Sequence, residues 1–383
     1  DVSTSSTLEE ISKLQKFCSL NIWKSSYQLK HKIPNQGEVQ NIKDLGSGYY
    51  FNKNIKKGNV VKLSDLKIKS PCRGLKAGTI KSDITLIKDG FKGEPLSQSH
   101  ISRTKIVSKK EIENCNKIEI SLPVRLHDFN NIREQFHLKN FEWHLSFQEI
   151  EKAENIILKK FKNIQDKKFS IHLPDYISSN SLIDPLSKNY TTKNKSNRII
   201  LKVLSLAKNL QQITGEEVPV IGSFSVCNYN KWEFYNLLSE EIYNLNKAHA
   251  VKILPQFLPK KAWYFGGSFE LDVFCDIKDL KYYYELPFGM CLDTAHCIMA
   301  ANYYLEKPSE WIDKLIPIAE HLHVSDAIGI DGEGVPFGKG ELKKDLNKLL
   351  LLNKRKVLEQ WEGHLNDFYG FKQGIKFISG KLI

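Results

Sequence analysis

The sequence lacks the features that define disulfide-linked, membrane and secreted proteins. Its seven cysteines are odd in number and no two of them form a CxxC pair, which argues against a disulfide framework and against a structural zinc site. No apolar run reaches the ~18 residues that a membrane span requires, and no charged-then-apolar segment opens the chain. We therefore expect a cytoplasmic protein without a membrane partner.

Acidic residues are in the minority, with 44 Asp and Glu against 56 Lys and Arg and a net charge of +12. Such an excess can mark a protein that binds nucleic acid or other anions. The lysines, however, are spread through almost every segment and are not gathered with aromatic residues on one stripe. We interpret most of the charge as solvated surface and expect no nucleic-acid partner.

The 383 residues are enough for two domains. Residues 1–46 are rich in Ser, Lys and Gln and begin with Asp, so we expect a linker or the end of a missing upstream domain. Residues 47–106 alternate short β-like runs with Gly and Lys turns, which predicts a small β-rich domain. Residues 115–383 alternate short apolar runs with long amphipathic stretches, the pattern of repeated βα units around a parallel sheet.

Eight apolar runs can be counted in this last region, with seven helical connections between them. They are KIEISL, FEWHLSF, FSIHLP, VPVIGSFS, AVKILPQ, GMCLDTAH, HLHVSDA and KVLEQW. Eight βα units over roughly 265 residues match a (β/α)8 barrel better than an open sheet. We predict an α/β protein, a TIM barrel preceded by the small β-rich domain.

In such a barrel the carboxyl ends of the strands meet at one rim, where the chemistry takes place. The fifth run ends in Gln256, the sixth in Asp293 and His296, the seventh near His323, and the eighth contains Glu359. Carboxylate, amide and imidazole groups that converge there suit a divalent cation such as Mn²⁺, Mg²⁺, Co²⁺ or Zn²⁺. We predict that Gln256, Asp293, His323 and Glu359 bind one such ion.

Several of these residues have structural alternatives. His296 can cap the next helix, and His321 shares the face of His323 in the same strand, so either histidine can be the ligand. Glu359 is harder to explain structurally, because an acidic side chain in an apolar strand is costly to bury unless it is paired or bound to a metal.

Two histidines end earlier strands, His144 in the second and His172 in the third. We expect them to line a substrate cavity, with a hydrogen-bonded histidine at the barrel mouth as the alternative. We also assign Trp361, His364 and Lys339 to substrate binding.

The motifs CLDTAH, HLHVSDA followed by GVPFGKGEL, and VLEQWEGH together resemble the xylose-isomerase-like barrel superfamily. That superfamily holds sugar and sugar-phosphate isomerases and epimerases as well as AP endonucleases of the endonuclease IV type. The resemblance implies the same metal ligands, at the positions of Gln256, Asp293, His323 and Glu359, and a substrate contact from His296.

Before the barrel, IKKGNVVKLSDLKIKSPCRGLKAG resembles the antifreeze-like (SAF) domain of N-acetylneuraminate synthases. The order of SAF domain and isomerase-like barrel, with LPKKAWYFGGSF between strands five and six, resembles a known fusion protein. It implies a sialic-acid-synthase barrel upstream in the same polypeptide and a homodimer.

The sequence departs from these families at three places. Gln256 stands where the epimerases have a glutamate that transfers a proton, and an amide cannot act as a base, so Glu359 or Glu333 would take that role. Ser70 precedes Pro71 where the SAF segment often has arginine. The endonucleases need a histidine after strand four and Asp-x-His after strand seven, and VIGSFS and DGEG provide neither.

We therefore expect a metal-dependent sugar or sugar-phosphate isomerase or epimerase linked to the biosynthesis of sialic-acid-like sugars, with Glu359, His296 and Glu333 as catalytic residues. In this chemistry a metal that holds adjacent carbonyl and hydroxyl oxygens acidifies the C–H bond between them, and a carboxylate moves the proton. The alternative is a barrel without turnover, a sugar-binding or scaffolding module of the synthase, whose active site the SAF domain would complete.

Overall fold

Eight parallel strands form the central sheet of the computed structural model, which describes residues 45–101, 107–161, 163–361, 363–365 and 367–382. Neighbours in the sheet follow the order β11-β10-β7-β6-β5-β18-β15-β14. The two end strands also meet, because Gln256 and Cys291 form a parallel bridge and Phe257 N–H donates to the Cys291 carbonyl at 2.9 Å. The sheet is thus closed, and the predicted TIM barrel is confirmed.

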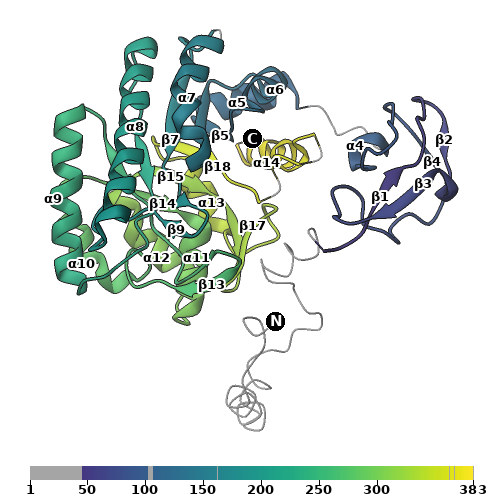
Figure 1. Ribbon diagram of the computed structural model, residues 1–383. Helices are drawn as coiled ribbons and strands as arrows, with labels where there is room; N and C mark the ends of the chain where they lie inside the picture. Colours follow the sequence, from purple (N-terminus) through teal and green to yellow (C-terminus); the bar gives the residue numbers. More distant parts are fainter. Residues whose placement is uncertain (1–44, 102–106, 162, 362, 366, 383) are drawn as a thin grey trace. The chain divides into compact units, whose positions relative to one another are not determined.

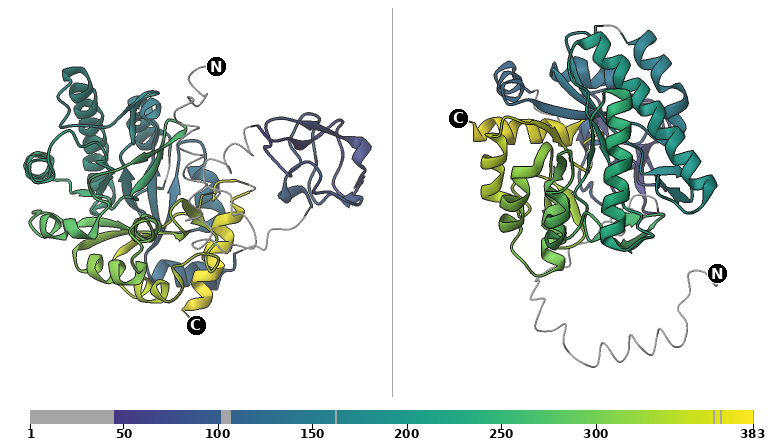
Figure 2. Two further views of the ribbon diagram at one scale, coloured as in Figure 1. Left: turned by 90° about the horizontal axis from the view of Figure 1, so that it is seen from below. Right: turned by 90° about the vertical axis from the view of Figure 1, so that its left-hand side faces the viewer.

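All eight predicted runs form barrel strands. Their bounds are β5 Ile120–Val124, β6 Asn140–His144, β7 Lys168–His172, β10 Val220–Gly222, β11 Ile253–Pro255, β14 Met290–Asp293, β15 Ala319–Val324 and β18 Arg355–Leu358. Helices surround the strands on the outside (Figures 1 and 2). They are α5 Lys109–Lys117, α6 Phe129–Phe136, α7 Phe147–Lys160, α8 Tyr190–Thr214, α9 Lys231–His249, α10 Leu280–Tyr283, α11 Thr294–Tyr303, α12 Pro308–Leu315, α13 Lys343–Leu350 and α14 Tyr369–Lys381.

Local sequence signals set where the long helices begin. A capping box of Ser146 and Glu149 starts α7, and Asn189 and Asn230 cap α8 and α9 through their side-chain oxygens. Helix α8 ends at Gly215, whose φ of 70° suits glycine. These helices pack their apolar sides on the strands, and the buried side chains around and within the barrel form one continuous hydrophobic cluster.

Three antiparallel hairpins, which the sequence pattern did not predict, follow the third, fifth and seventh barrel strands. They pair β8 Tyr176–Ser178 with β9 Ser181–Leu182, β12 Lys261–Tyr264 with β13 Gly267–Glu270, and β16 Asp326–Ile328 with β17 Gly332–Val335. Each leaves the carboxyl end of its strand, so the hairpins supply walls to the rim where the predicted site lies.

Residues 45–101 form a small β-rich unit with its own hydrophobic cluster, built on Tyr49, Phe51, Ile55, Val61, Leu86 and Leu96. Strand β1 Gly48–Phe51 pairs with β3 Leu66–Lys69, and β2 Val60–Val61 pairs with β4 Ile84–Thr85. The short 3-10 turn η2 Leu63–Asp65 and the helix α4 Gln98–Ile101 complete it.

The predicted linker, residues 1–46, lies almost entirely outside the described residues, as does the predicted boundary at 106. Among the described helices, none is both long and apolar enough to cross a membrane.

Candidate metal centre

The carboxyl ends of the last three barrel strands bring Asp293, His323 and Glu359 together. Asp293 ends β14 and caps α11, since its Oδ1 accepts the backbone N–H of His296 at 3.0 Å. His323 Nδ1 lies 3.7 Å from Asp293 Oδ2 and 3.4 Å from Oε1 of Glu359, which directly follows β18. The ligand atoms of the three residues all lie within 4.8 Å of one another, a spacing that suits one cation with oxygen and nitrogen ligands.

The electrostatics of this cluster favour a positive charge within it. Burial raises the pKa of Glu359 to about 7, with Asp293 adding to the effect and His323 opposing it. Burial lowers the pKa of His323, but Cys291, Glu359 and other acidic neighbours outweigh it and hold that pKa well above the ordinary value. Carboxylates crowded in this way repel one another, so a divalent cation would relieve the repulsion.

Gln256 joins the cluster, but with its amide nitrogen toward the other ligands. Its Nε2 donates to Asp293 Oδ2 at 3.0 Å and lies 3.1 Å from His323 Nδ1. Its Oε1 accepts from Ser223 Oγ at 2.8 Å and lies 3.0 Å from His172 Nε2. Only the oxygen of an amide is a metal ligand, so Gln256 would have to turn its amide to become the predicted fourth ligand.

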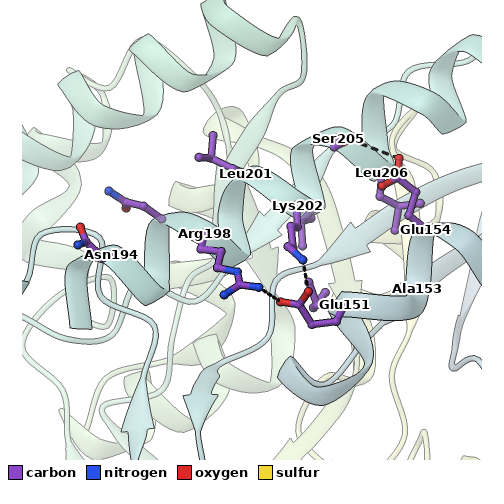
Figure 3. A pocket seen from close by; sticks show the side chains of 12 residues that line it. Glu151, Ala153, Glu154, Asn194, Arg198, Leu201, Lys202, Ser205 and Leu206 are labelled. Carbon is purple, nitrogen blue, oxygen red and sulfur yellow. Dashed lines mark hydrogen bonds and ion pairs between the residues drawn. The ribbon is translucent and has the colours of Figure 1, made fainter. Parts of the chain in front are cut away.

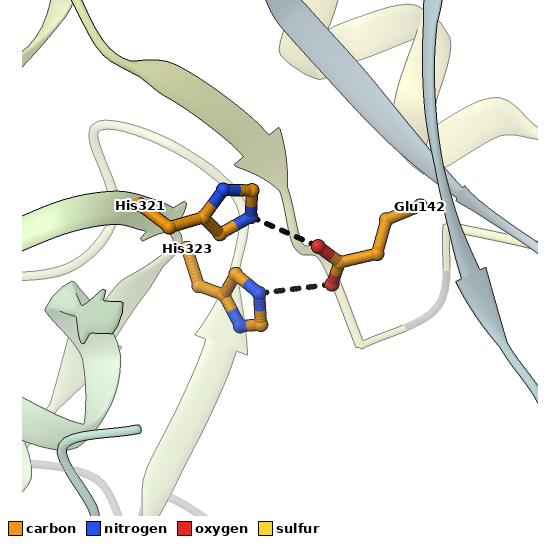
Figure 4. A group of neighbouring side chains, drawn as sticks. All are labelled: Glu142, His321 and His323. Carbon is orange, nitrogen blue, oxygen red and sulfur yellow. Dashed lines mark hydrogen bonds and ion pairs between the residues drawn. The ribbon is translucent and has the colours of Figure 1, made fainter. Parts of the chain in front are cut away.

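A residue that the sequence analysis missed, Glu142 on β6, lies next to this cluster (Figure 4). Its Oε2 lies 2.9 Å from His321 Nε2 and accepts from Ser170 Oγ at 2.7 Å. Its Oε1 lies 2.9 Å from both His144 Nε2 and His323 Nε2. Burial would raise the pKa of Glu142, but the charge of His323 and the hydrogen bonds from the histidines hold it well below its ordinary value.

Glu142 lies next to Nε2 of His323, whereas Asp293 and Glu359 lie next to Nδ1. It also forms three-residue groups able to hold a metal, one with His321 and His323 and one with His144 and Glu359. Glu142 pairs with His323 Nε2 at 2.9 Å, as carboxylates do with metal-binding histidines, and Nδ1 is left facing Asp293 and Glu359. The donor set therefore fits a bound cation.

The signal for Glu142 was present in the sequence. It is an acidic residue inside the apolar run FEWHLSF, two positions before His144 and hence on the same face of the strand. Like Glu359, Glu142 is an acidic side chain in an apolar strand, and such a group is costly to bury unless it is paired or bound to a metal. Burial lowers the pKa of both His144 and His321 to about 4, so they are expected to be neutral donors to this carboxylate.

A cavity of about 510 Å³ opens onto the cluster. Of the predicted residues, those that line it are His144, His172, Gln256, His296, Glu333, Glu359 and Trp361. Asp293 and His323 are fully buried and do not line it. Aromatic side chains from the hairpins and the strand ends, Tyr176, Trp263 and Tyr264, form much of its remaining wall.

His296 and Glu333 meet in this cavity. His296 Nδ1 lies 3.0 Å from the Phe257 carbonyl, which can only accept, so this nitrogen carries a proton. The other ring nitrogen lies 3.5 Å from Glu333 Oε1 on β17. Burial opposes a charge on His296, but Asp293 and Glu333 raise its pKa to about 10. The pair thus offers a charged donor and a carboxylate to a bound molecule.

Two residues assigned to substrate binding, Lys339 and His364, are not among those that line the cavity. Lys339 is exposed in a turn closed by its N–H to the Pro336 carbonyl at 3.0 Å. His364 Nδ1 lies 2.7 Å from Asp128 Oδ2, and its ring packs edge-on against Phe371. A role in substrate binding stays a prediction for both residues.

A second cavity, of about 480 Å³, lies between α7 and α8 on the helical layer (Figure 3). Its carboxylates have partners within the cavity wall: Glu151 pairs with Arg198 at 3.0 Å and with Lys202, and Glu154 accepts a hydrogen bond from Ser205 at 3.3 Å. It holds no group of His, Cys, Asp and Glu residues that could bind a metal among the described side chains. The chemistry therefore belongs to the cavity at the barrel rim.

No protein-family model matches the chain, and no curated protein sequence matches it. Among solved structures, the chain is similar to the crystal structure of SacUVDE, with 12% identity and a TM-score of 0.41 over 67% of this chain and 84% of that one. It is also similar to the crystal structure of AsfvAP:AG, with 11% identity and a TM-score of 0.41 over 69% of this chain and 99% of that one. A likeness this low assigns no function, and the barrel is established by its strand order and closure.

Proposed function

We propose that the barrel is a metal-dependent isomerase or epimerase that acts on a sugar or sugar phosphate. The observation that carries the proposal is the convergence of Asp293, His323 and Glu359 beside a cavity that also presents His296 and Glu333. A divalent cation held by the first three would polarise a substrate carbonyl and the hydroxyl beside it, and so acidify the C–H bond between them.

The chain's own groups would then handle the proton. Glu359 would be the base, because it is the one carboxylate of the three proposed ligands that lines the cavity. The Phe257 carbonyl holds the ring of charged His296 through Nδ1, and the Nε2–H, which lies 3.5 Å from Glu333 Oε1, would donate a hydrogen bond to a substrate oxygen. Gln256 cannot accept a proton, so one carboxylate would both remove and return it, and this favours aldose–ketose isomerisation over epimerisation.

Solvent exchange tests this proposal. The metal-loaded protein is incubated in D₂O with a set of aldoses, ketoses, N-acetylhexosamines and their phosphates, and NMR follows loss of the C–H signal beside the carbonyl. We expect exchange with at least one sugar, and its loss in Glu359→Gln and Asp293→Asn. Failure of every sugar to exchange with a protein that binds metal would refute the catalytic proposal.

A second candidate function is a non-catalytic sugar-binding or scaffolding module. The orientation of Gln256 favours it, because the amide nitrogen already lies between Asp293 and His323 as a neutral partner. Metal analysis of the purified protein separates the two: an unmetallated protein that binds sugars without exchange supports the module.

We also propose a link to sialic-acid-like sugars, on the strength of the sequence resemblance of residues 47–106 to SAF domains. The SAF-like unit would complete the active site of a synthase barrel upstream in the same polypeptide, within a homodimer. The experiment is to condense phosphoenolpyruvate with an N-acetylated hexosamine using a synthase with and without this unit. Full activity without it would rule out this role.

A further inference from the structure

One carboxylate oxygen in the cavity has no partner. Asp175 lines the cavity between His172 and the first rim hairpin, and its Oδ1 is buried without a hydrogen bond. No ion pair or side-chain hydrogen bond involves Asp175 among the described residues. The residue is half-buried, but a buried carboxylate oxygen left without a donor is costly, so this oxygen is expected to find its partner in a bound molecule.

The surroundings hold Asp175 in place. Its carbonyl accepts the N–H of Ile183 at 2.8 Å, which closes the β8–β9 hairpin directly after it. The next residue, Tyr176, packs edge-on against Tyr264 and Phe265 of the neighbouring hairpin, and its hydroxyl accepts the Phe265 N–H at 3.2 Å. Burial, with the charge of Asp175, raises the pKa of Tyr264, so that hydroxyl stays protonated.

The chemistry of the site points to a neutral donor. Asp175 belongs to none of the groups of described residues that could hold a metal. Two cationic side chains, Arg125 and Lys261, line the same cavity, which disfavours a cationic ligand. Trp263 and Tyr264 line the same cavity with aromatic rings, and a sugar ring combines an apolar face that packs on such rings with hydroxyl donors at its edge.

We propose that Asp175 is a specificity-determining residue that accepts a hydrogen bond from one hydroxyl group of the sugar, at a carbon away from the reacting carbonyl. The inference rests on the proposed function and deepens it. A site built to bind a hydroxyl discriminates strongly against the analogue that lacks it, because the site's buried group is then left unpaired. The aromatic wall would pack against the ring and fix which hydroxyl reaches Asp175.

The test measures binding to the full chain loaded with Mn²⁺. Isothermal titration calorimetry ranks D-glucose, D-mannose, D-fructose, N-acetyl-D-mannosamine and their 6-phosphates, and then the monodeoxy analogues of the tightest binder. We expect one deoxy analogue to bind the wild type roughly 10- to 100-fold more weakly than its parent. In Asp175→Ala the parent should weaken to the same level, and removal of that one hydroxyl should then have no further effect on affinity. Asp175→Asn keeps an acceptor oxygen but loses the charge, so its loss of affinity should be smaller.

The matched control is Asp166→Asn, an exposed aspartate outside the cavity, which should leave all affinities unchanged. Thermal unfolding checks folding, and Asp175→Asn should not be less stable, because it removes a charge whose buried oxygen has no donor.

Parent binding that stays unchanged in both Asp175 variants would overturn the inference and leave the proposed function standing. The inference would also be overturned if amino sugars bound the wild type more tightly than neutral sugars and lost this advantage in the Asp175 variants. Asp175 would then recognise an ammonium group and not a hydroxyl group. If no sugar binds the metal-loaded wild type, the proposed function itself fails.

Discussion

At the centre of the cluster, the amide of Gln256 presents its nitrogen to Asp293 and His323. A charged His323 and a bound cation both need an oxygen there instead, so either one requires the amide to turn. The turned amide would find acceptors for its nitrogen in Ser223 Oγ and in His172 Nε2. The His172 ring can accept because its Nδ1 lies 2.6 Å from the Leu173 carbonyl, which holds the ring proton on that side.

Replacing Gln256 with Glu tests this arrangement. The new carboxylate adds a charged ligand and removes the N–H groups that occupy the cation's side of the cluster, so Mn²⁺ affinity should rise by about tenfold or more. Gln256→Leu removes both the ligand oxygen and the obstructing nitrogen and is the comparison. Calorimetric titration with Mn²⁺ measures both variants. Equal affinity in Gln256→Glu and wild type would place Gln256 outside the metal centre.

Glu142 offers a second prediction at the scale of one side chain. Glu142→Gln keeps the size of the group but removes the charge that faces His323 Nε2. Such outer carboxylates orient histidine ligands, and their loss costs about 10- to 100-fold in metal affinity. We expect this loss in Mn²⁺ titrations, with Glu151→Gln on the surface of α7 as the control. Unchanged affinity would mean that Glu142 only fills the barrel interior.

The raised pKa of Glu359 predicts how stability depends on pH. Between about pH 4.5 and 7 the folded protein holds a proton on Glu359 that the unfolded chain releases, so this group's contribution is complete below pH 4.5 and lost as the pH rises through 7. The shift corresponds to at most about 3 kcal/mol. In urea unfolding with EDTA, Glu359→Gln should therefore lose less stability than wild type over this window.

His144 and His321 have lowered pKa values, so their contribution to stability changes with pH in the opposite direction. Both are present in wild type and in Glu359→Gln, so the difference between the two proteins isolates Glu359. The exposed Glu285→Gln is the control and should follow the wild type. A Glu359→Gln profile parallel to that of the wild type would mean that Glu359 is ionised throughout.

At the scale of elements, the eight barrel strands could be predicted because each is a short apolar run bounded by helical periodicity. The rim hairpins could not be predicted. Their strands are two to four residues long, and runs such as YIS or GEGV carry no alternation that separates them from a loop. The clustering of Asp293, His323 and Glu359 followed from strand order alone. The orientation of the Gln256 amide depends on four partners, which lie on or directly after four other strands.

The motif GVPFGKGEL has a structural explanation that its sequence did not reveal. The buried carboxylate of Asp326 accepts four backbone N–H groups, from Ala327, Gly338, Gly340 and Leu342, at 2.8 to 3.0 Å. It thereby ties the segment after β17 to the start of the hairpin that carries Glu333. Gly340 is required there, because a Cβ would lie 2.2 Å from Asp326 Oδ1.

Asp326→Ala should therefore loosen this hairpin as a unit. Hydrogen bonds to a charged group contribute about 1.5 to 3 kcal/mol each, and the backbone donors would be left buried without partners. We expect faster hydrogen exchange across residues 326–342 and a lower melting temperature, while the β12–β13 hairpin keeps its exchange rates. Exchange that rises equally in both hairpins would indicate general destabilisation instead.

At the scale of the whole molecule, the positive charge is unevenly distributed. Residues 45–101 hold ten lysines and one arginine against three aspartates and one glutamate, which is +7 of the chain's +12. The same residues bury only six hydrophobic side chains in a cluster of their own, against the large cluster of the barrel. A core this small stabilises a unit of this length only weakly.

This difference predicts two unfolding transitions in calorimetry of the full chain, of which only one responds to metal. Ligand bound to the folded state adds about 2.7 kcal/mol at 100 times its Kd, which should raise the melting temperature of a barrel of this size by roughly 5 to 10 °C. Mn²⁺ in place of EDTA should move the barrel transition by that amount and leave the transition of residues 45–101 where it is. Asp293→Asn should abolish the shift that Mn²⁺ causes in the melting temperature of the barrel, and should leave the transition of residues 45–101 unchanged. A single transition that moves as a whole would mean that the two hydrophobic clusters unfold together, and residues 47–106 would then not be a separate domain.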